Sequence, residues 1–223
     1  MSVPDQLRGG LIASCQPVDD GPMDRPEIVA AMAQAAVAGG AAGLRIEGLE
    51  NLRATRAHVN VPIIGIVKRN LPDSPVRITV TVRDAQELLE AGADIVAYDA
   101  TRRPRSDRRE DIVAAILDGG AIAMADCSTV EDAQTAMAEG ATIIGTTLSG
   151  YTDETAGDDD APDFGLIREF RRLDSFVMAE GRFNSPDLAK KAIAAGADAV
   201  TVGSALTRLE VVTGWFAEAV RRS

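Results

Sequence analysis

Residues 91–97, Ala-Gly-Ala-Asp-Ile-Val-Ala, join the end of a helical pattern to an apolar run rich in β-branched side chains. Glycine readily takes the positive φ of a helix C-cap, and an apolar run that starts directly afterwards is typical of a buried parallel strand. The same junction recurs at residues 38–46, 139–145 and 195–202. The four junctions lie roughly 50 residues apart, the length of two strand–helix units, so the chain is predicted to hold about eight such units.

Eight strand candidates follow from this pattern, and helical patterns lie between them. They are Leu11–Gln16, Gly43–Gly48, Ile63–Arg69, Asp94–Ala100, Ala121–Ser128, Thr142–Ser149, Ser175–Gly181 and Ala199–Ser204. Strands that alternate with helices pair in parallel through right-handed crossovers, and eight units close into a (β/α)₈ TIM barrel of the α/β class.

An open, doubly wound sheet is the competing fold. That fold usually places a glycine-rich phosphate loop after its first strand, whereas this chain has Ser14-Cys15-Gln16-Pro17 at that position. The barrel is therefore favoured. Barrels of this kind commonly run to the length of this chain as one unit, so residues 1–223 are expected to form a single catalytic domain.

Composition excludes several classes of function. The net charge is −11, with 34 acidic against 23 basic residues and 4% aromatic content, so a nucleic acid partner is not expected. Neither a signal peptide pattern nor an apolar run long enough for a membrane span is present, and we expect a soluble, cytoplasmic protein without a membrane partner. Two cysteines and one histidine, His58, give no disulfide framework, zinc site or histidine triad, and no metal is predicted.

Polar residues stand at the ends of the predicted strands, on all of the first seven except the sixth. In a barrel these ends meet at the catalytic face, so their side chains are candidates for chemistry. They are Gln16, Arg45, Glu47, Lys68, Asp99, Asp126 and Glu180.

Strand parity selects three of these residues. Side chains two apart share a face of a strand, and Lys68, Asp126 and Glu180 each follow apolar residues at that spacing. If those apolar residues fill the barrel, the three charged groups also point inward. Cys15 and Cys127 then face the helices as buried, unreactive thiols. A lysine that merely extends to water from the end of a strand is the alternative for Lys68.

An inward lysine beside two carboxylates and an arginine suits proton transfer. Desolvation and a neighbouring cation such as Arg45 lower the pKa of a lysine toward the range of a useful base. Asp126 and Glu180 could then bind hydroxyl groups or protonate an oxygen. A Schiff-base lysine is the competing chemical use, and residue spacing alone does not separate the two.

The last two strand ends predict a phosphate site. Residues 180–185, Glu-Gly-Arg-Phe-Asn-Ser, follow the seventh strand, and residues 203–208, Gly-Ser-Ala-Leu-Thr-Arg, follow the eighth. Small residues let backbone N–H groups approach an anion, and these two loops are where barrels usually bind phosphate. The insertion from Tyr151 to Asp163, with Asp158, Asp159 and Asp160, is expected to be a solvated loop over the barrel mouth, with a lid as the sharper hypothesis.

Motifs at nearly every strand end resemble those of the N-acetylmannosamine-6-phosphate 2-epimerase family, and the resemblance spans almost the whole chain. They are residues 14–16 (SCQ), 43–48 (GLRIEG), 62–69 (PIIGIVKR), 124–129 (MADCST), 145–151 (GTTLSGY), 179–182 (AEGR) and 202–208 (VGSALTR).

This resemblance implies a barrel of the ribulose-phosphate-binding type that interconverts N-acetylmannosamine 6-phosphate and N-acetylglucosamine 6-phosphate, in sialic acid and amino-sugar catabolism. It implies Lys68 as catalytic acid and base with Glu180 and Asp126 as partners, and no cofactor. It also implies a phosphorylated amino sugar as the bound molecule. The further residues that it implies in substrate binding are Gln16, Arg45, Gly181, Gly203, Ser204 and Arg208.

Two other functions stay open on the residues alone. One is another phosphosugar barrel enzyme of the Schiff-base aldolase type, and the other is a non-catalytic barrel that binds a sugar phosphate. The C-terminal helix, Leu209–Val220, carries Val212, Trp215, Phe216 and Ala219 at helical spacing, which favours packing against the core. A homodimer is the alternative use of that face.

Overall fold

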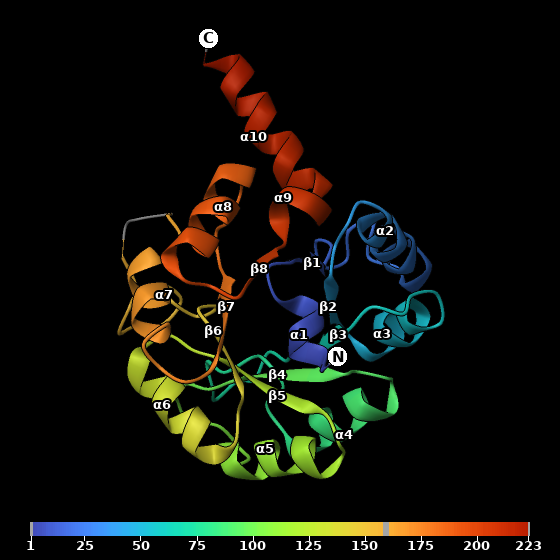
Figure 1. Ribbon diagram of the computed structural model, residues 1–223. Coiled ribbons are helices and arrows are strands. Elements are labelled where there is room, and N and C mark those ends of the chain that lie inside the picture. The colour runs from blue at the N-terminus through green and yellow to red at the C-terminus, as the bar shows by residue number, and fades with distance from the viewer. Residues whose placement is uncertain (1, 158–160, 223) are drawn as a thin grey trace.

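The structure, a computed structural model, describes residues 2–157 and 161–222. Eight parallel strands form a closed barrel in which each strand pairs with its neighbours in the chain and β8 pairs with β1 (Figure 1). The strands are β1 Leu11–Cys15, β2 Gly43–Glu47, β3 Ile63–Ile66, β4 Ile95–Asp99, β5 Ile122–Asp126, β6 Ile143–Gly145, β7 Phe176–Glu180 and β8 Ala199–Val202. The predicted (β/α)₈ barrel is confirmed.

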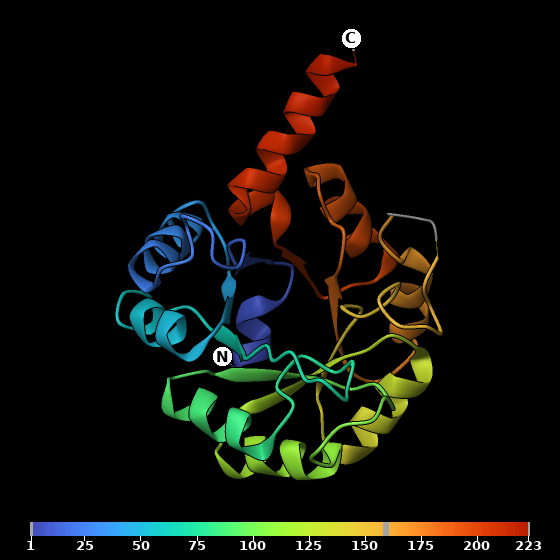
Figure 2. The ribbon, with the colours of Figure 1, turned by 180° about the vertical axis from the view of Figure 1, so that it is seen from behind.

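Helices α2 to α8 connect successive strands and surround the barrel, whereas α1 precedes β1 and α9 and α10 follow β8 (Figures 1 and 2). They are α1 Val3–Leu7, α2 Pro26–Ala38, α3 Leu49–Arg56, α4 Val82–Glu90, α5 Arg109–Asp118, α6 Val130–Glu139, α7 Phe164–Phe170, α8 Pro186–Ala195, α9 Ser204–Thr207 and α10 Leu209–Arg221. Within the described ranges, no helix has the length and apolar composition needed to cross a bilayer.

Local sequence explains where several helices begin and end. Gly92, Gly140 and Gly196 take positive φ at the predicted helix ends, where a side chain would be strained. At the opposite ends, the side chains of Thr129 and Ser185 accept backbone N–H groups of the first turns of α6 and α8. The predicted helix starts are therefore confirmed.

The strands are shorter than predicted, most clearly β3 and β6. The predicted third strand ran to Arg69, but pairing with the neighbouring strands stops at Ile66. Beyond it, the backbone turns to pair antiparallel with its own loop, with Lys68 bridged to Ile78. This loop crosses the mouth of the barrel seen in Figure 2. Lys68 is therefore fixed by a second backbone segment and not by the barrel alone.

Apolar side chains fill the inside of the barrel. Ile64, Ile66, Met124 and Met178 belong to this inner cluster, as strand parity predicts. Leu7 of α1 joins it from the opening at the strand starts, where α1 closes the barrel. The interior is thus a packed core, and the charged side chains of the strands stand at its carboxyl end.

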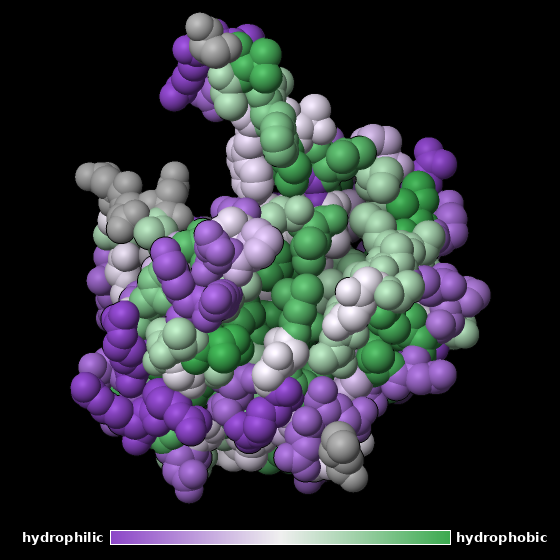
Figure 3. All heavy atoms as spheres, turned by 45° about the horizontal axis from the view of Figure 1, so that its top comes forward, coloured by the Kyte–Doolittle hydropathy of each residue, from purple (hydrophilic) through white to green (hydrophobic). Residues whose placement is uncertain are grey.

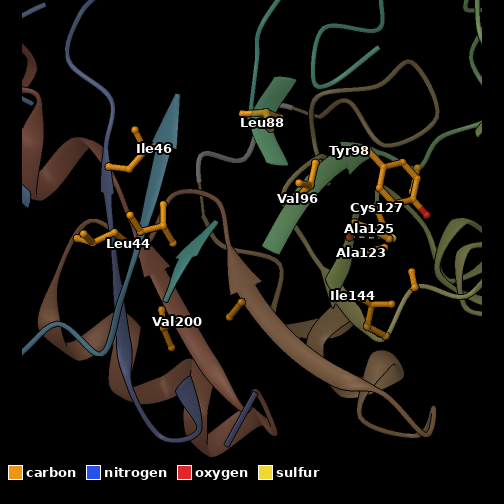
Figure 4. Close-up of a cluster of buried hydrophobic side chains, with 14 of the residues drawn as sticks. Leu44, Ile46, Leu88, Val96, Tyr98, Ala123, Ala125, Cys127, Ile144 and Val200 are labelled. Carbon is orange, nitrogen blue, oxygen red and sulfur yellow. Dashed lines mark hydrogen bonds between the residues drawn. The ribbon is translucent and has the colours of Figure 1, made fainter. Parts of the chain in front are cut away.

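A second apolar cluster lies between the sheet and the helices, and part of it is drawn in Figure 4. Cys15 and Cys127 are buried in this outer cluster, as parity predicts. Burial raises the pKa of the Cys15 thiol to about 12 and also raises that of Cys127. Both thiols therefore stay protonated and act as small apolar groups. His58 is exposed, as predicted.

The prediction that the C-terminal helix packs on the core is wrong. None of the side chains of α10 is buried, and the helix projects away from the barrel (Figure 1). The position between α2 and α8, where a helix that follows β8 would close the outer ring, is not covered by it. A band of apolar side chains is visible there below α10 (Figure 3). Helical spacing predicted the apolar face of α10 but could not tell what that face contacts.

Gly65→Val is expected to lower the free energy of unfolding by about 1–3 kcal/mol, because the space behind β3 is already filled. A Cβ at Gly65 would lie 2.9 Å from Ala93 Cβ and 3.1 Å from Leu88 Cδ2. Urea unfolding measures the change. Gly214→Ala in α10 is the control, because a Cβ there meets no atom within 4 Å. Equal stabilities of the wild type and Gly65→Val would contradict this packing.

Candidate active site

Three charged side chains from β2, β5 and β7 meet beneath the barrel mouth. Arg45 donates from Nη1 to Asp126 Oδ1 (3.1 Å) and from Nη2 to Asp126 Oδ2 (2.6 Å), and Nη1 also donates to Glu180 Oε2 (3.1 Å). The side chains of Arg45 and Asp126 are 1% and 0% exposed. One buried cation therefore balances two carboxylates. Burying these charges costs free energy, because each of them loses its hydration.

The surroundings of Glu180 raise the pKa of its carboxyl group. Burial raises the pKa of its carboxyl group to about 7, with Asp126 acting in the same direction and Arg45 and Lys68 opposing it. A group with a pKa near the working pH can both release and accept a proton during a reaction cycle.

Lys68 lies across the mouth from Glu180. Its Nζ donates to Gln16 Oε1 at 2.6 Å, and its backbone N–H donates to Glu47 Oε1 at 3.2 Å. Burial lowers the pKa of the Lys68 ammonium, and the nearby charges of Arg45 and Arg208 lower it further. The side chain is held at the mouth by Gln16, and its surroundings favour loss of the proton, as the sequence predicted.

A polar cavity of about 260 Å³ opens beside this group, over the ends of β7, β8 and β1. Four residues of the two predicted anion loops line it, namely Gly181, Gly203, Ser204 and Arg208. The residues that complete its wall are Ser14, Gln16, Thr147, Tyr151, Glu180, Arg182, Phe183, Asn184 and Thr201. The cavity thus joins the predicted anion loops to the titratable Glu180.

Gln16 connects the two sides of the site. Its side chain donates to Ser14 Oγ at 2.6 Å while accepting from Lys68, and its backbone carbonyl accepts from Arg208 Nε at 3.0 Å. Arg208 is therefore placed against the first strand end, with its charge near the cavity. The guanidinium of Arg182 stacks over the ring of Tyr151 at 5.3 Å and supplies a second cation to the rim.

The structure separates two of the predicted polar strand ends from this group. Asp99 accepts hydrogen bonds from Arg103 Nη2 (2.6 Å) and Thr101 Oγ1 (2.6 Å), so it organises the loop after β4. Glu47 anchors the backbone of Lys68. Arg45 does not line the cavity but lies below it.

Sequence reasoning missed the contribution of the sixth strand. Thr147 Oγ1 donates to Asp126 Oδ1 at 2.7 Å, while Thr146 Oγ1 accepts from the backbone N–H of Glu180 at 3.0 Å. Hydroxyl groups carry no charge, so the search for charged strand ends passed over them. The only signal was the pair of threonines directly after an apolar run.

The loop after β6 is described in part. Tyr151 reaches the cavity, and Ser149 Oγ donates to Asp163 Oδ2 at 2.7 Å. Asp158, Asp159 and Asp160 lie outside the described residues, so the lid hypothesis stays a prediction. In the part of the chain that the structure describes, no group of three or more His, Cys, Asp and Glu side chains is placed to hold a metal ion.

Fold and site together define a class of protein. A closed (β/α)₈ barrel with a buried charged group and an anion-binding type of cavity at its carboxyl face has the architecture of a barrel enzyme that acts on small phosphorylated molecules.

Comparison with known proteins gives the family. The family described as "Putative N-acetylmannosamine-6-phosphate epimerase" matches residues 29–222. Two relatives are named "Putative N-acetylmannosamine-6-phosphate 2-epimerase". The protein of Pasteurella multocida is 60% identical over 218 residues, and that of Haemophilus influenzae is 58% identical over 216 residues. Each match covers 97% of this chain and 94% of the relative. The N-acetylmannosamine-6-phosphate 2-epimerase of Clostridium perfringens superposes with a TM-score of 0.94 at 38% identity, over 98% of this chain and 96% of that one. The chain belongs to the N-acetylmannosamine-6-phosphate epimerase family.

Glu180→Gln is expected to change how stability depends on pH. Burial raises the pKa of Glu180 from its ordinary value of 4.5 to about 7, so the folded protein binds more protons than the unfolded chain between these values. The stability that this proton contributes therefore falls as the pH rises from about 5 to 7. The difference in unfolding free energy, wild type minus Glu180→Gln, should fall over this range and level off above it.

Urea unfolding at pH 5, 6, 7 and 8 measures that difference. Glu154→Gln, which removes a carboxylate from the surface, is the matched control. A wild-type minus Glu180→Gln difference that stays constant across the series would contradict the raised pKa.

Proposed function

We propose that this protein interconverts N-acetylmannosamine 6-phosphate and N-acetylglucosamine 6-phosphate by moving the proton on C2, with residues 1–223 acting as one catalytic domain. The observation that carries the proposal is that the cavity formed by the predicted anion loops lies beside two proton carriers, Lys68 and Glu180. Membership of the epimerase family supports the choice of substrate.

The chemistry requires only proton transfer. In the open-chain sugar the C2 proton is α to the C1 aldehyde, so a base can remove it to leave an enolate. Return of a proton to the other face inverts C2, while the acetamido group stays attached. No atom is oxidised or reduced, so the proposed reaction calls for no nicotinamide, and we expect it to proceed without a cofactor.

Lys68 and Glu180 are suited to opposite faces of that enolate. They stand at the ends of β3 and β7, which lie four strands apart in a closed order of eight and therefore face each other across the mouth. Lowering of the Lys68 pKa increases the fraction of neutral amine, while a Glu180 pKa of about 7 keeps a proton available. A sugar lying between them would meet one group on each side.

The remaining residues hold the substrate in this arrangement. Gly181, Gly203, Ser204 and Arg208 are proposed to bind the phosphate, and Gln16 to contact the sugar beside Lys68. Arg45 is buried below the cavity and is paired with Asp126 and Glu180. Its proposed role is to stabilise negative charge that develops on the substrate above this group. Either carboxyl group could assist opening of the sugar ring.

Lys68→Ala is expected to lower the rate of deuterium incorporation at C2 by at least about a thousandfold, because the base is lost. Proton NMR in deuterated water with N-acetylmannosamine 6-phosphate measures the exchange. Lys191→Ala, which removes an exposed lysine of α8, should exchange at the wild-type rate. Inorganic phosphate should bind both variants and the wild type with the same affinity.

Other outcomes would contradict the proposal. Exchange that survives in Lys68→Ala would assign the base to another residue. A borohydride-stable adduct between Lys68 and the sugar would favour the Schiff-base alternative. Binding of the sugar phosphate by the wild type without any exchange at C2 would favour the non-catalytic alternative.

We also propose that the protein forms a homodimer through α10. Leu209, Phe216 and Val220 are 61%, 71% and 73% exposed and repeat at helical spacing, so they make an apolar stripe on an isolated helix. The uncovered position between α2 and α8 offers an apolar surface (Figures 1 and 3). The α10 of a second copy is proposed to occupy it.

Phe216→Glu is expected to convert the dimer into a monomer, because it places a charge in the middle of the apolar stripe. Light scattering measures the mass, which should fall from twice the 23.4 kDa chain mass to that mass. Gly214→Glu adds the same residue on the opposite side of α10 and should leave the dimer intact. A monomeric wild type would contradict the proposal.

A further inference from the structure

The two carboxyl groups that share Arg45 receive unequal numbers of hydrogen bonds. Asp126 accepts from Arg45 Nη1 (3.1 Å) and Thr147 Oγ1 (2.7 Å) at Oδ1, and from Arg45 Nη2 (2.6 Å) at Oδ2. Glu180 accepts from Arg45 Nη1 at Oε2 (3.1 Å). The Thr201 hydroxyl lies near Glu180 and opposes the rise in its pKa, but it does not reach hydrogen-bonding geometry. Asp126 is therefore the better supplied with donors.

These hydrogen bonds decide which carboxyl group holds a proton. Burial raises the pKa of Glu180 to about 7, so the pair holds a proton below that pH. A proton on Asp126 would displace one of its donors, and hydrogen bonds to a carboxylate favour the charged form. The Asp126 side chain is 0% exposed, so water does not replace a lost donor. Glu180 is 13% exposed and lines the first cavity, where a carboxyl O–H has room to donate.

Thr147 is the side chain that separates the two carboxyl groups. Arg45 contacts both of them, whereas the Thr147 hydroxyl donates to Asp126. The backbone at Gly145 leaves space for that contact, since a Cβ there would lie 3.1 Å from Thr147 Oγ1. Thr147 also lines the first cavity, but its hydroxyl proton is engaged by Asp126.

The remaining charged groups around the mouth form no ion pair with either carboxyl group within residues 2–157 and 161–222. They are Glu47, Lys68, Asp99 with its partners Arg103 and Arg105, Arg182 and Arg208. Lys68 lowers the pKa of Glu180 from across the mouth. The direct contacts that distinguish the two carboxyl groups are therefore those of Arg45 and Thr147.

We propose that Thr147 is a positioning residue that directs the proton of the buried pair to Glu180. Its hydroxyl holds Asp126 in the ionised form, which leaves the proton on the carboxyl group that lines the cavity. The consequence for the reaction rests on the proposed function: the proton on Glu180 is the one that the enolate receives. Thr147 acts on that step through Asp126.

Infrared spectroscopy locates the proton, because a protonated carboxyl group has its own C=O stretching band. Carbon-13 at the side-chain carboxyl groups of the aspartates shifts this band only when an aspartate holds the proton. The spectra are recorded at pH 6, below the Glu180 pKa of about 7, and the spectrum of Glu180→Gln is subtracted. The wild-type band should not shift with the label. In Thr147→Val the ratio of shifted to unshifted band should rise at least about tenfold, because Asp126 loses one donor.

Thr147→Ser is the matched control, because it keeps the hydroxyl donor and should restore the wild-type band. A wild-type band that shifts with the label would overturn the proposal. So would an unshifted band in Thr147→Val, or equal spectra of the valine and serine variants.

Exchange at C2 of N-acetylmannosamine 6-phosphate gives a second readout. At pH 6, kcat of Thr147→Val should fall by the same factor as its unshifted band, while KM stays within about twofold of the wild-type value. A raised KM at constant kcat would make Thr147 a substrate contact and overturn the positioning role. A shifted band with undiminished exchange would support the positioning role and instead contradict the role of Glu180 in the proposed function.

Discussion

The buried ion group of Arg45, Asp126 and Glu180 is the interaction on which the site depends. The three side chains come from β2, β5 and β7, which meet only because the barrel is closed. A buried ion pair usually stabilises a fold less than an apolar core of the same volume would. With one cation for two carboxylates, the group also leaves Glu180 partly uncompensated. Burial raises the pKa of Glu180 to about 7, and the nearby Asp126 carboxylate acts in the same direction, so the energetic cost of the group is tied to a property that proton transfer needs.

Arg45 also couples the two sides of the mouth. Its charge lowers the pKa of Lys68 and opposes the rise in the pKa of Glu180. Thr147 holds Asp126 from the sixth strand, and Gln16 holds Lys68 from the first. These contacts fix the positions of the charges before any substrate arrives, which is the condition under which electrostatic stabilisation is most effective.

Much of this arrangement could be predicted from the sequence, because it follows from period and spacing. Glycine junctions at regular intervals predicted the barrel, and alternation along β3, β5 and β7 predicted that Lys68, Asp126 and Glu180 point inward. Parity does not report depth, however, so the burial of Arg45 below the cavity could not be seen. The hydroxyl groups of Thr146 and Thr147 carry no charge, so their position after the sixth strand did not single them out. The helical spacing in α10 was equally compatible with packing on the core and with an exposed apolar face. It predicts that apolar side chains line one side of the helix, but it does not predict what they contact.

The fixation of Lys68 suits the inversion at carbon that we propose. In the proposed reaction the planar enolate receives its proton on the face opposite to the one that lost it, and two proton carriers on opposite sides of it would serve these two steps. A flexible lysine at a strand end could reach either face of the enolate, so the two proton carriers would no longer act on separate faces. Here the backbone of Lys68 is bridged to Ile78 and bonded to Glu47, while its amine is bonded to Gln16. Glu180 is held in turn by Thr146 and Arg45 across the barrel. By pairing with the end of its own strand, the loop after β3 holds the lysine on one side of the mouth, which is the placement that the proposed reaction needs.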